Sequence, residues 1–190
     1  LAINPAGGNV GIGTSSPQRQ LQVGEYGTGS GTIAIASATN GYGYLVFGDS
    51  VAGDGVYRGA ITYDHSNDAM LFNTAASERM RIDSSGVLLV GKTSTSLSSD
   101  GVAAGAGQGL DATVYNNNVA RFNRRNSDGS IVSFYKDGSV TGSIGTSGVD
   151  LTIGTGDVGL KFNDASNRID PWNVTTNTSV DGAFDLGKTD

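Results

Sequence analysis

Hydrophobic residues in this chain occur in short stretches that either alternate with polar residues or run for about four positions before a turn signal. Such patterns are typical of β-strands, whereas an amphipathic helix repeats its apolar positions every three to four residues. One segment, 74–80, has a helix-like composition but is too short to form a stable helix, so we interpret it as a turn leading into a strand from Glu78 to Asp83. The other predicted strands are 33–35, 44–47, 87–90, 131–135 and 151–153.

Asn-Gly and Asp-Gly pairs stand beside many of these strands. Both pairs tolerate the positive φ angles that tight hairpin turns need, so each is predicted to form a hairpin turn. The last two pairs in the chain lie on either side of one strand and together predict a meander. The five pairs are Asn40-Gly41, Asp54-Gly55, Asp100-Gly101, Asp128-Gly129 and Asp137-Gly138.

The composition narrows the fold to β-structure. Of the 190 residues, 30 are glycine, and unbranched helix formers are scarce while β-branched and aromatic residues are common. Hydrophobic residues make up 37% of the chain, below the roughly 45–50% of ordinary domains, although that figure also counts glycine. A single copy would struggle to close a thick core, so we expect an all-β protein that is extended or oligomeric.

Charge and cysteine content argue against several classes of function. The chain has no cysteine, so it can form neither a disulfide nor a thiolate metal site. Its net charge of −6, without a block of like charges, argues against nucleic-acid binding. It has no run of about 18 apolar residues and no signal sequence, so we expect no membrane insertion. Because the first residue is Leu1, we expect the sequence to begin inside a longer polypeptide.

The glycine- and alanine-rich stretch around residue 105 marks a change along the chain. We predict a β-rich, repeat-like segment over residues 1–100, a linker or closely packed segment over 101–110, and a distal β-rich segment over 111–190. Internal similarity between 8–15 and 86–94 supports a β array built from degenerate units.

Several of these segments resemble modules of the tail fibres of tailed bacteriophages. Residues 78–86, and residues 8–17 followed by 21–23, are similar to a segment common in such fibres. Three further stretches resemble the distal part of these fibres, and the similar segments together cover about two thirds of the chain. The distal stretches are 128–144, 153–163 and 168–187.

This resemblance implies an elongated, intertwined homotrimeric β-rich fibre in the virion tail. It implies a structural and adhesive role, with a host cell-surface glycan or outer-surface protein as receptor and other tail proteins as N-terminal partners. In many relatives an endosialidase-type intramolecular chaperone follows at the C-terminus, and we assign no autoproteolytic residue here. Two alternatives stay open: a tailspike enzyme that degrades host surface polysaccharide, and a fibrous bacterial surface adhesin.

Aromatic and basic side chains are the candidates for receptor contact. Aromatic rings can stack on sugars, although such residues more often pack at subunit interfaces. Arginines can contact an anionic glycan or form ion pairs between chains. The candidate contact residues are Tyr42, Tyr44, Tyr57, Trp172, Arg124 and Arg125.

Two glycine motifs match nucleotide-binding patterns but lack the required context. Residues 86–93 fit the phosphate-loop pattern, yet their middle positions read as a strand, and residues 154–159 fit the dinucleotide pattern but precede a second strand instead of a helix. We therefore predict no cofactor and no nucleotide site.

Carboxylate side chains are the other candidates for catalysis or metal binding. Four aspartates could serve a glycan hydrolase or bind Ca²⁺, and the single histidine, His65, lies near them in the sequence. All four lie in turn-like sequence, however, where aspartate is an ordinary turn residue. We accordingly assign no catalytic and no metal-binding residue. The four are Asp49, Asp54, Asp64 and Asp68.

Overall fold

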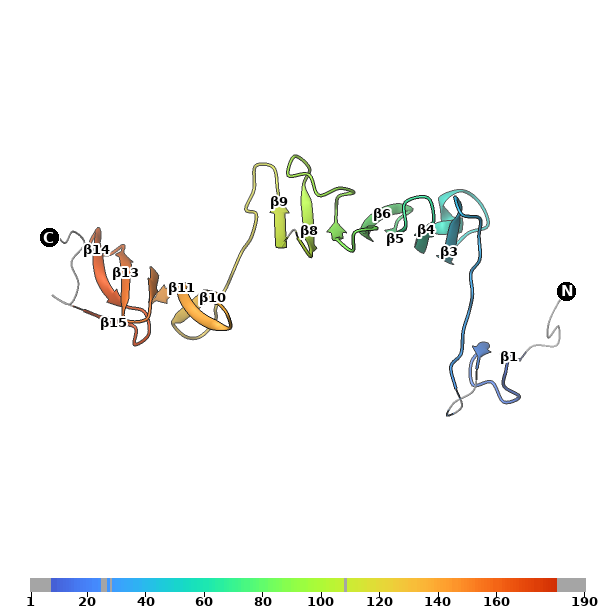
Figure 1. Ribbon diagram of the computed structural model, residues 1–190, viewed down its shortest axis with the longest axis horizontal. Coiled ribbons are helices and arrows are strands. Elements are labelled where there is room, and N and C mark those ends of the chain that lie inside the picture. The colour runs from blue at the N-terminus through green and yellow to red at the C-terminus, as the bar shows by residue number, and fades with distance from the viewer. Residues whose placement is uncertain (1–7, 25–26, 28, 108, 181–190) are drawn as a thin grey trace. The chain divides into compact units, whose positions relative to one another are not determined.

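The computed structural model describes residues 8–24, 27, 29–107 and 109–180 (Figure 1). The chain divides into two compact units, unit 1 up to Val119 and unit 2 from Ala120. The described residues form fifteen strands and one short 3₁₀ helix and contain no α-helix, so the predicted all-β fold class is confirmed. No helix within these described ranges is long and apolar enough to cross a membrane.

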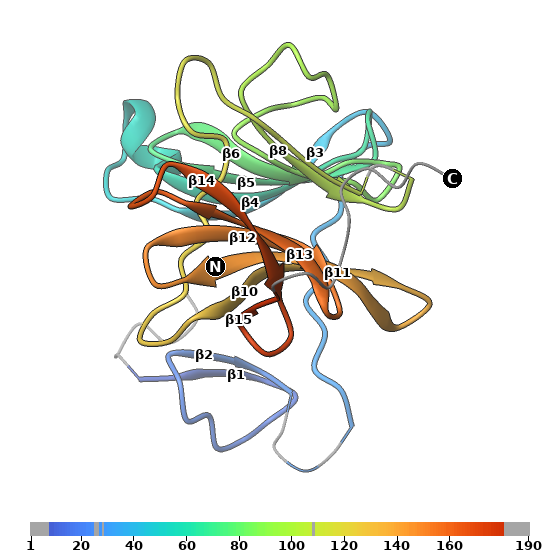
Figure 2. The ribbon, with the colours of Figure 1, turned by 90° about the vertical axis from the view of Figure 1, so that its left-hand side faces the viewer.

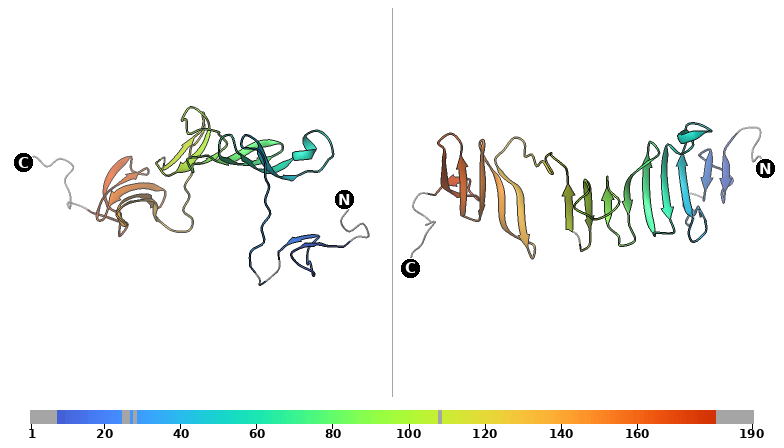
Figure 3. Two further views of the ribbon diagram at one scale, coloured as in Figure 1. Left: turned by 45° about the vertical axis from the view of Figure 1, so that its right-hand side comes forward. Right: turned by 90° about the horizontal axis from the view of Figure 1, so that it is seen from above.

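Unit 1 contains two sheets. Strand β1 (Val10–Ile12) pairs in parallel with β2 (Leu21–Val23). The larger sheet is a seven-stranded antiparallel meander in which each strand pairs with the next in sequence, as the right-hand view of Figure 3 shows. Its strands are β3 (Tyr42–Phe47), β4 (Gly59–Asp64), β5 (Ala69–Thr74), β6 (Ser77–Ile82), β7 (Leu88–Val90), β8 (Gly101–Gly105) and β9 (Gly109–Thr113).

A 3₁₀ helix, η1 (Gly53–Tyr57), lies in the connection between β3 and β4. Figure 2 shows it as a short coil at one end of the strands of the larger sheet. Its position follows from the topology, because β3 ends at Phe47 and β4 begins at Gly59, the residue paired with Phe47.

Unit 2 is a second antiparallel meander, again with strands in sequence order. Its six strands are β10 (Gly129–Lys136), β11 (Ser139–Ser147), β12 (Asp150–Thr155), β13 (Val158–Asn163), β14 (Arg168–Asn173) and β15 (Thr178–Ser179).

The strand predictions agree with the structure except at residues 33–35. The predicted strands at 44–47, 78–83, 87–90, 131–135 and 151–153 all coincide with strands to within one or two residues. Residues 33–35 are not a strand, and the side chains of Ile33 and Ile35 are exposed. Alternation alone cannot supply the ladder partner that a strand needs.

Of the five predicted hairpin turns, one is correct and four are wrong. Asp137 and Gly138 both have positive φ and form the two-residue turn between β10 and β11. Asp54-Gly55 lies in η1, and the remaining three pairs stand just before β3 or at the first residues of β8 and β10, where long connections enter the sheet. Other residues make the tight turns, among them Ala75 and Ala76, both with positive φ.

The sequence alone leaves open whether the segment 101–110 is a linker or a closely packed segment. Its residues 101–105 form β8, and 109–110 begin β9, within the larger sheet of unit 1. Ala103 of β8 is fully buried and packs with Val87 and Leu89 in the one cluster of buried apolar residues found in the described chain. The division between the two units falls after residue 119.

The register of the unit 1 sheet separates its two faces. Residues directly opposite in an antiparallel ladder point to the same face. Two rows of paired residues that cross all seven strands carry only aliphatic or aromatic side chains, methionine or glycine, and we call the surface they share the unit 1 apolar face. The rows are Leu45, Ile61, Phe72, Met80, Val90, Val102, Ala112 and Gly43, Tyr63, Met70, Ile82, Leu88, Ala104, Leu110.

The opposite face of this sheet, which we call the polar face, is mixed and partly buried, because Leu89 and Ala103 of the buried cluster share it with charged and polar residues. Thr62 and Asp64 of β4 are buried there, and Arg81 forms a bidentate ion pair with Glu78 at 2.6 Å. The pKa of Arg81 is raised above its usual value, chiefly by these hydrogen bonds to Glu78. The single chain thus shields the polar face better than the apolar one.

Unit 2 repeats this arrangement. Two rows of residues, which we call the unit 2 apolar face, lie on one side of the sheet, and small or polar residues lie on the other. The rows, which are apolar except for Thr146, are Val132, Ile144, Ile153, Leu160, Pro171 and Thr146, Leu151, Phe162, Ile169. On the polar side Ser143, Asp150 and Thr152 are buried.

Glycine allows the unit 2 sheet to close toward its polar face. Gly154 and Gly159 are directly opposite each other on β12 and β13, and a Cβ at Gly154 would lie 2.5 Å from the Gly159 Cα. A Cβ at Gly159 would lie 2.7 Å from Val174 Cγ1. Because both residues lack a side chain, the strands can approach closely on this side. As a result, β12 contacts β14 across β13.

Candidate functional site

A pocket of about 350 Å³ lies on the polar face of unit 1, where η1 meets β3. Tyr44 and Val46 come from β3, while Val56 and Tyr57 come from η1. The register explains why residues distant in sequence share this site, since Val46 pairs with Ala60 and Ala60 pairs with Asn73. The pocket is lined by Tyr44, Val46, Val56, Tyr57, Ala60, Asn73 and Ala76.

Half-exposed tyrosines dominate this pocket. The side chains of Tyr44 and Tyr57 are 51% and 49% exposed. The ring of Tyr42 lies beside that of Tyr44, with centroids 5.8 Å apart and planes tilted by 36°. The structure therefore brings three of the predicted contact residues into one region of unit 1, two of them in the pocket itself.

The pocket also contains a polar group that the sequence did not suggest. Asn73 Nδ2 donates a hydrogen bond to Thr62 Oγ1 at 3.3 Å, which fixes the amide on the polar face. The amide and the tyrosine hydroxyls offer both donors and acceptors beside aromatic rings. Nothing in the local sequence of Asn73 indicates that it belongs to a site. Its place in the pocket follows only from its cross-strand pairing with Ala60.

The loop that carries η1 is held by its own backbone. The amides of Asp49 and Ser50 both donate to the Gly55 carbonyl, at 2.8 and 3.3 Å. A Cβ at Gly48 would lie 2.6 Å from the Val56 carbonyl oxygen, so a larger residue would push the loop away. These contacts hold Val56 and Tyr57 against β3.

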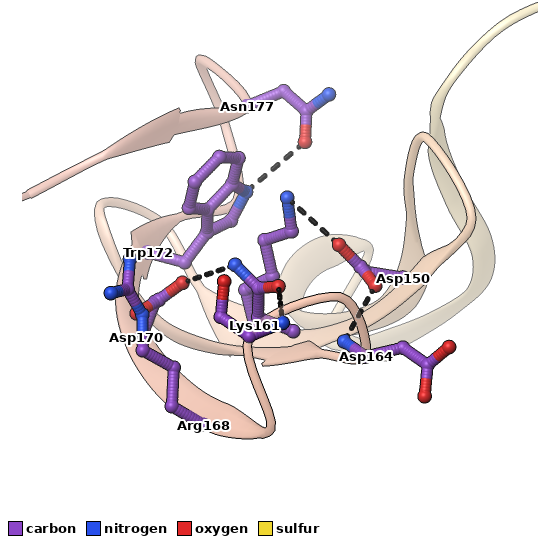
Figure 4. A network of polar contacts seen from close by, with 9 residues as sticks. Asp150, Lys161, Asp164, Arg168, Asp170, Trp172 and Asn177 are labelled. Carbon is purple, nitrogen blue, oxygen red and sulfur yellow. Dashed lines mark hydrogen bonds and ion pairs between the residues drawn. The ribbon is translucent and has the colours of Figure 1, made fainter.

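Trp172 lies in unit 2, within a network of polar contacts on the polar face (Figure 4). Its indole Nε1 donates to Asn177 Oδ1 at 3.1 Å, and the Lys161 ammonium lies 4.6 Å from the centroid of its ring system. Lys161 also forms an ion pair with Asp150 Oδ2 at 3.1 Å. Trp172 is thus engaged in contacts within its own unit.

The acidic members of this network are stabilised in their charged form. The pKa of Asp150 is lowered, first because its Oδ1 accepts a hydrogen bond from the Asp164 amide at 3.0 Å and then because of Lys161. The pKa of Asp170 is lowered mainly by a hydrogen bond from Asn163 Nδ2 at 2.9 Å. Arg168 Nε contributes a further contact to Asp170 at 2.6 Å.

The two candidate arginines differ in their surroundings. Arg124 donates to the carbonyls of Ser127 and Ser130 and to Ser127 Oγ, at 3.0, 3.2 and 3.1 Å. It therefore fastens the loop that leads into β10. Arg125 is exposed on the same loop.

The four candidate aspartates do not gather at one place in unit 1. Asp64 and Asp68 flank the β4–β5 turn, whereas Asp49 and Asp54 lie at the η1 end of the same strands. Asp64 accepts hydrogen bonds from Asn67 Nδ2 at 2.7 Å and the Ser66 amide at 2.9 Å, and the Asn67 bond is the main cause of its lowered pKa. Within the described residues, no three histidine or acidic side chains are placed to hold a metal ion.

The same turn holds His65. Its ring packs edge-on against Tyr63 with centroids 4.8 Å apart, and the Tyr63 hydroxyl donates to Asp68 Oδ1 at 3.2 Å. This hydrogen bond raises the pKa of Tyr63. His65 and Asp68 thus have structural contacts in a hairpin turn.

Both nucleotide-like motifs have the structures expected of turns and strands. The middle of residues 86–93 is β7, and Lys92 is buried with its ammonium donating to the Ser96 carbonyl at 2.6 Å. Residues 93–100 form turns instead of a helix. Residues 154–159 form the hairpin between β12 and β13.

Comparison of the chain with models of protein families, with characterised proteins and with solved structures finds no match.

Proposed function

We propose that this chain is a structural and adhesive segment of a homotrimeric tail fibre of a tailed bacteriophage and that it helps attach the virion to the host cell surface. The proposal starts from the sequence segments that resemble such fibres and from two meanders of short strands. The observation that carries the adhesive part is the pocket lined by Tyr44 and Tyr57.

The chemistry of this pocket suits a sugar. A pyranose ring has an apolar face that stacks on an aromatic ring and hydroxyls that exchange hydrogen bonds with amide and phenol groups. The pocket offers two tyrosine rings, one asparagine amide and the apolar side chains of Val46 and Val56. The receptor that fits this pocket is therefore a glycan of the host cell surface.

The four candidate aspartates of the tailspike alternative are divided between two ends of the unit 1 sheet. Hydrolysis of a glycosidic bond uses two carboxyl groups about 5–10 Å apart. In this chain Asp49 and Asp54 lie at the opposite end of β3 and β4 from Asp64 and Asp68, and the latter two make turn contacts.

The test is binding of the full chain to an array of bacterial surface polysaccharides and to cells that display them. We expect Tyr44→Ala and Tyr57→Ala each to weaken binding by about tenfold or more, because each removes a stacking ring. Tyr115→Ala is the matched control, since Tyr115 is 80% exposed and does not line the pocket. Equal binding by all three variants would overturn the assignment of the pocket, and shortened oligosaccharides in the incubation would favour the tailspike enzyme.

A further inference from the structure

The apolar faces of units 1 and 2 are left largely bare by their own unit. The seven strands of the larger unit 1 sheet and the six strands of the unit 2 sheet each form a single layer. On the unit 1 apolar face the residue Ile35 lies at the β3 edge, where a Cβ at Gly43 would be 3.5 Å from Ile35 Cγ2. We infer that other copies of this chain cover both faces, with each sheet turning its apolar face toward the corresponding face of its partners around a shared axis. The number of copies, three, rests on the proposed function, whereas the choice of face rests on the structure alone.

The unit 1 apolar face has the composition of a protein core. Its two rows contain no charged residue among fourteen paired positions. Two charges border it. Arg79 is the extra residue of the β-bulge in β6, and its Nε donates to Thr74 Oγ1 at 3.3 Å at the end of the strands. Asp68 Oδ1 accepts a hydrogen bond from the Tyr63 hydroxyl at 3.2 Å. The side chains of Leu45, Phe47 and Leu110 remain between one half and three quarters exposed.

The unit 2 apolar face shows the same pattern independently. Its nine paired positions also lack charge. The four charged residues paired within the same ladders lie on the opposite face; they are Asp150, Lys161, Arg168 and Asp170. Phe134, Ile153 and Ile169 are each at least 40% exposed. A monomeric protein seldom leaves two such surfaces uncovered.

The area of these faces suits a stable interface. Strands about 4.8 Å apart with a rise of about 3.4 Å per residue give each sheet a face of about 600 Å² in outline. Stable interfaces bury about 800 Å² on each partner, so the face of each unit by itself is of comparable size.

The absence of charge on both faces favours another copy of this chain as the occupant. A surface without charge would leave any charged group of a partner buried and unpaired, which is costly. The corresponding face of a second copy brings no such group. Cyclic symmetry then lets each copy present the same surface to the shared axis. In this arrangement the polar faces, with the Tyr44 and Tyr57 pocket, point outward.

The test uses single-cysteine variants of this chain, in which the introduced thiol is the sole reactive one because the 190 residues contain no cysteine. Leu45 and Val46 are adjacent on β3, similarly exposed in the single chain at 50% and 41%, and point to opposite faces. Leu45→Cys and Val46→Cys are compared for their rate of reaction with a maleimide reagent. Phe134→Cys and Ser133→Cys form the equivalent pair on β10, with Phe134 on the apolar face.

We expect a trimer by light scattering, with cysteines at positions 45 and 134 reacting about tenfold or more slowly than those at 46 and 133, and equal rates after unfolding in denaturant. A trimer with equal rates within both pairs would overturn the choice of face but leave the proposed function standing. A monomer of 19.3 kDa would overturn both the inference and the trimeric stoichiometry. If one variant fails to assemble, the pair in the other unit still decides the outcome.

Discussion

The Lys161 ammonium lies 3.1 Å from Asp150 Oδ2, and both side chains are largely sheltered, with 15% and 9% of their surfaces exposed. Lys161 stands on β13 and Asp150 at the start of β12, so this ion pair links neighbouring strands on the polar face of unit 2. The Trp172 ring covers the ammonium at 4.6 Å. Unit 2 therefore stabilises its polar face with charge and hydrogen bonds instead of apolar packing.

Asp150→Asn is expected to destabilise unit 2. The substitution leaves a sheltered ammonium without its carboxylate, which costs more than the loss of an exposed ion pair. Trp172 is the single tryptophan of the chain and lies beside Lys161, so its fluorescence during denaturant unfolding reports on this unit. Asp128→Asn, at an exposed position before β10, should leave the unfolding midpoint unchanged. If Asp150→Asn unfolds at the same denaturant midpoint as the unsubstituted chain, the ion pair between Asp150 and Lys161 contributes nothing to stability.

Leu89→Ala is expected to destabilise unit 1 by about 2–5 kcal/mol, because it removes a fully buried side chain and leaves a cavity. Leu89 has no exposed surface and packs with Val87 and Ala103, the one buried apolar cluster in the described residues. Leu97→Ala is the control, since Leu97 is exposed in the β7–β8 connection. Chemical unfolding of both variants at the same chain concentration measures the effect, and a cost below about 1 kcal/mol for Leu89→Ala would mean that the core lies elsewhere.

The sequence predicted the type of structure but not its faces. Alternation and composition were enough for an all-β fold and for most strand positions, because both reflect local preferences. The bulge at Arg79 and the pairing of Leu45 with Ile61 depend on register, which is fixed by contacts between strands and is not visible in either strand alone. For this reason the sequence identified Tyr44 and Tyr57 as candidates but missed Asn73.

Turns show the same limit. Asp-Gly pairs are strong hairpin signals, yet the β5–β6 hairpin turns through two alanines, Ala75 and Ala76, with φ of 50° and 57°. Here strand pairing on both sides imposes a backbone conformation that alanine disfavours. Tertiary structure has overridden local preference, so sequence-based prediction placed the turn without identifying its type.

Ala75→Asn is therefore expected to stabilise the protein by about 0.5–1 kcal/mol, because asparagine tolerates positive φ better than alanine and is favoured at this turn position. Ala75→Val is the matched opposite, since a β-branched residue resists this conformation and should destabilise the hairpin. Thermal unfolding at one chain concentration measures both. If both variants change the melting temperature in the same direction and by the same amount, the backbone conformation of the turn is not the cause of the change.

Acid should remove the contribution of Asp150 to the stability of unit 2. The folded-state pKa of Asp150 is lowered below its ordinary value of 3.8, first by the Asp164 amide and then by Lys161. The unfolded chain therefore takes up a proton at a higher pH than the folded one, so the contribution is present above about pH 4 and is lost as the pH falls through the folded-state pKa. The difference in unfolding midpoint between the natural chain and Asp150→Asn, followed by Trp172 fluorescence, should be constant from about pH 7 to pH 5 and shrink below about pH 4. A difference that persists undiminished to about pH 2 would mean that the substitution acts through the shape of the site and not through its charge.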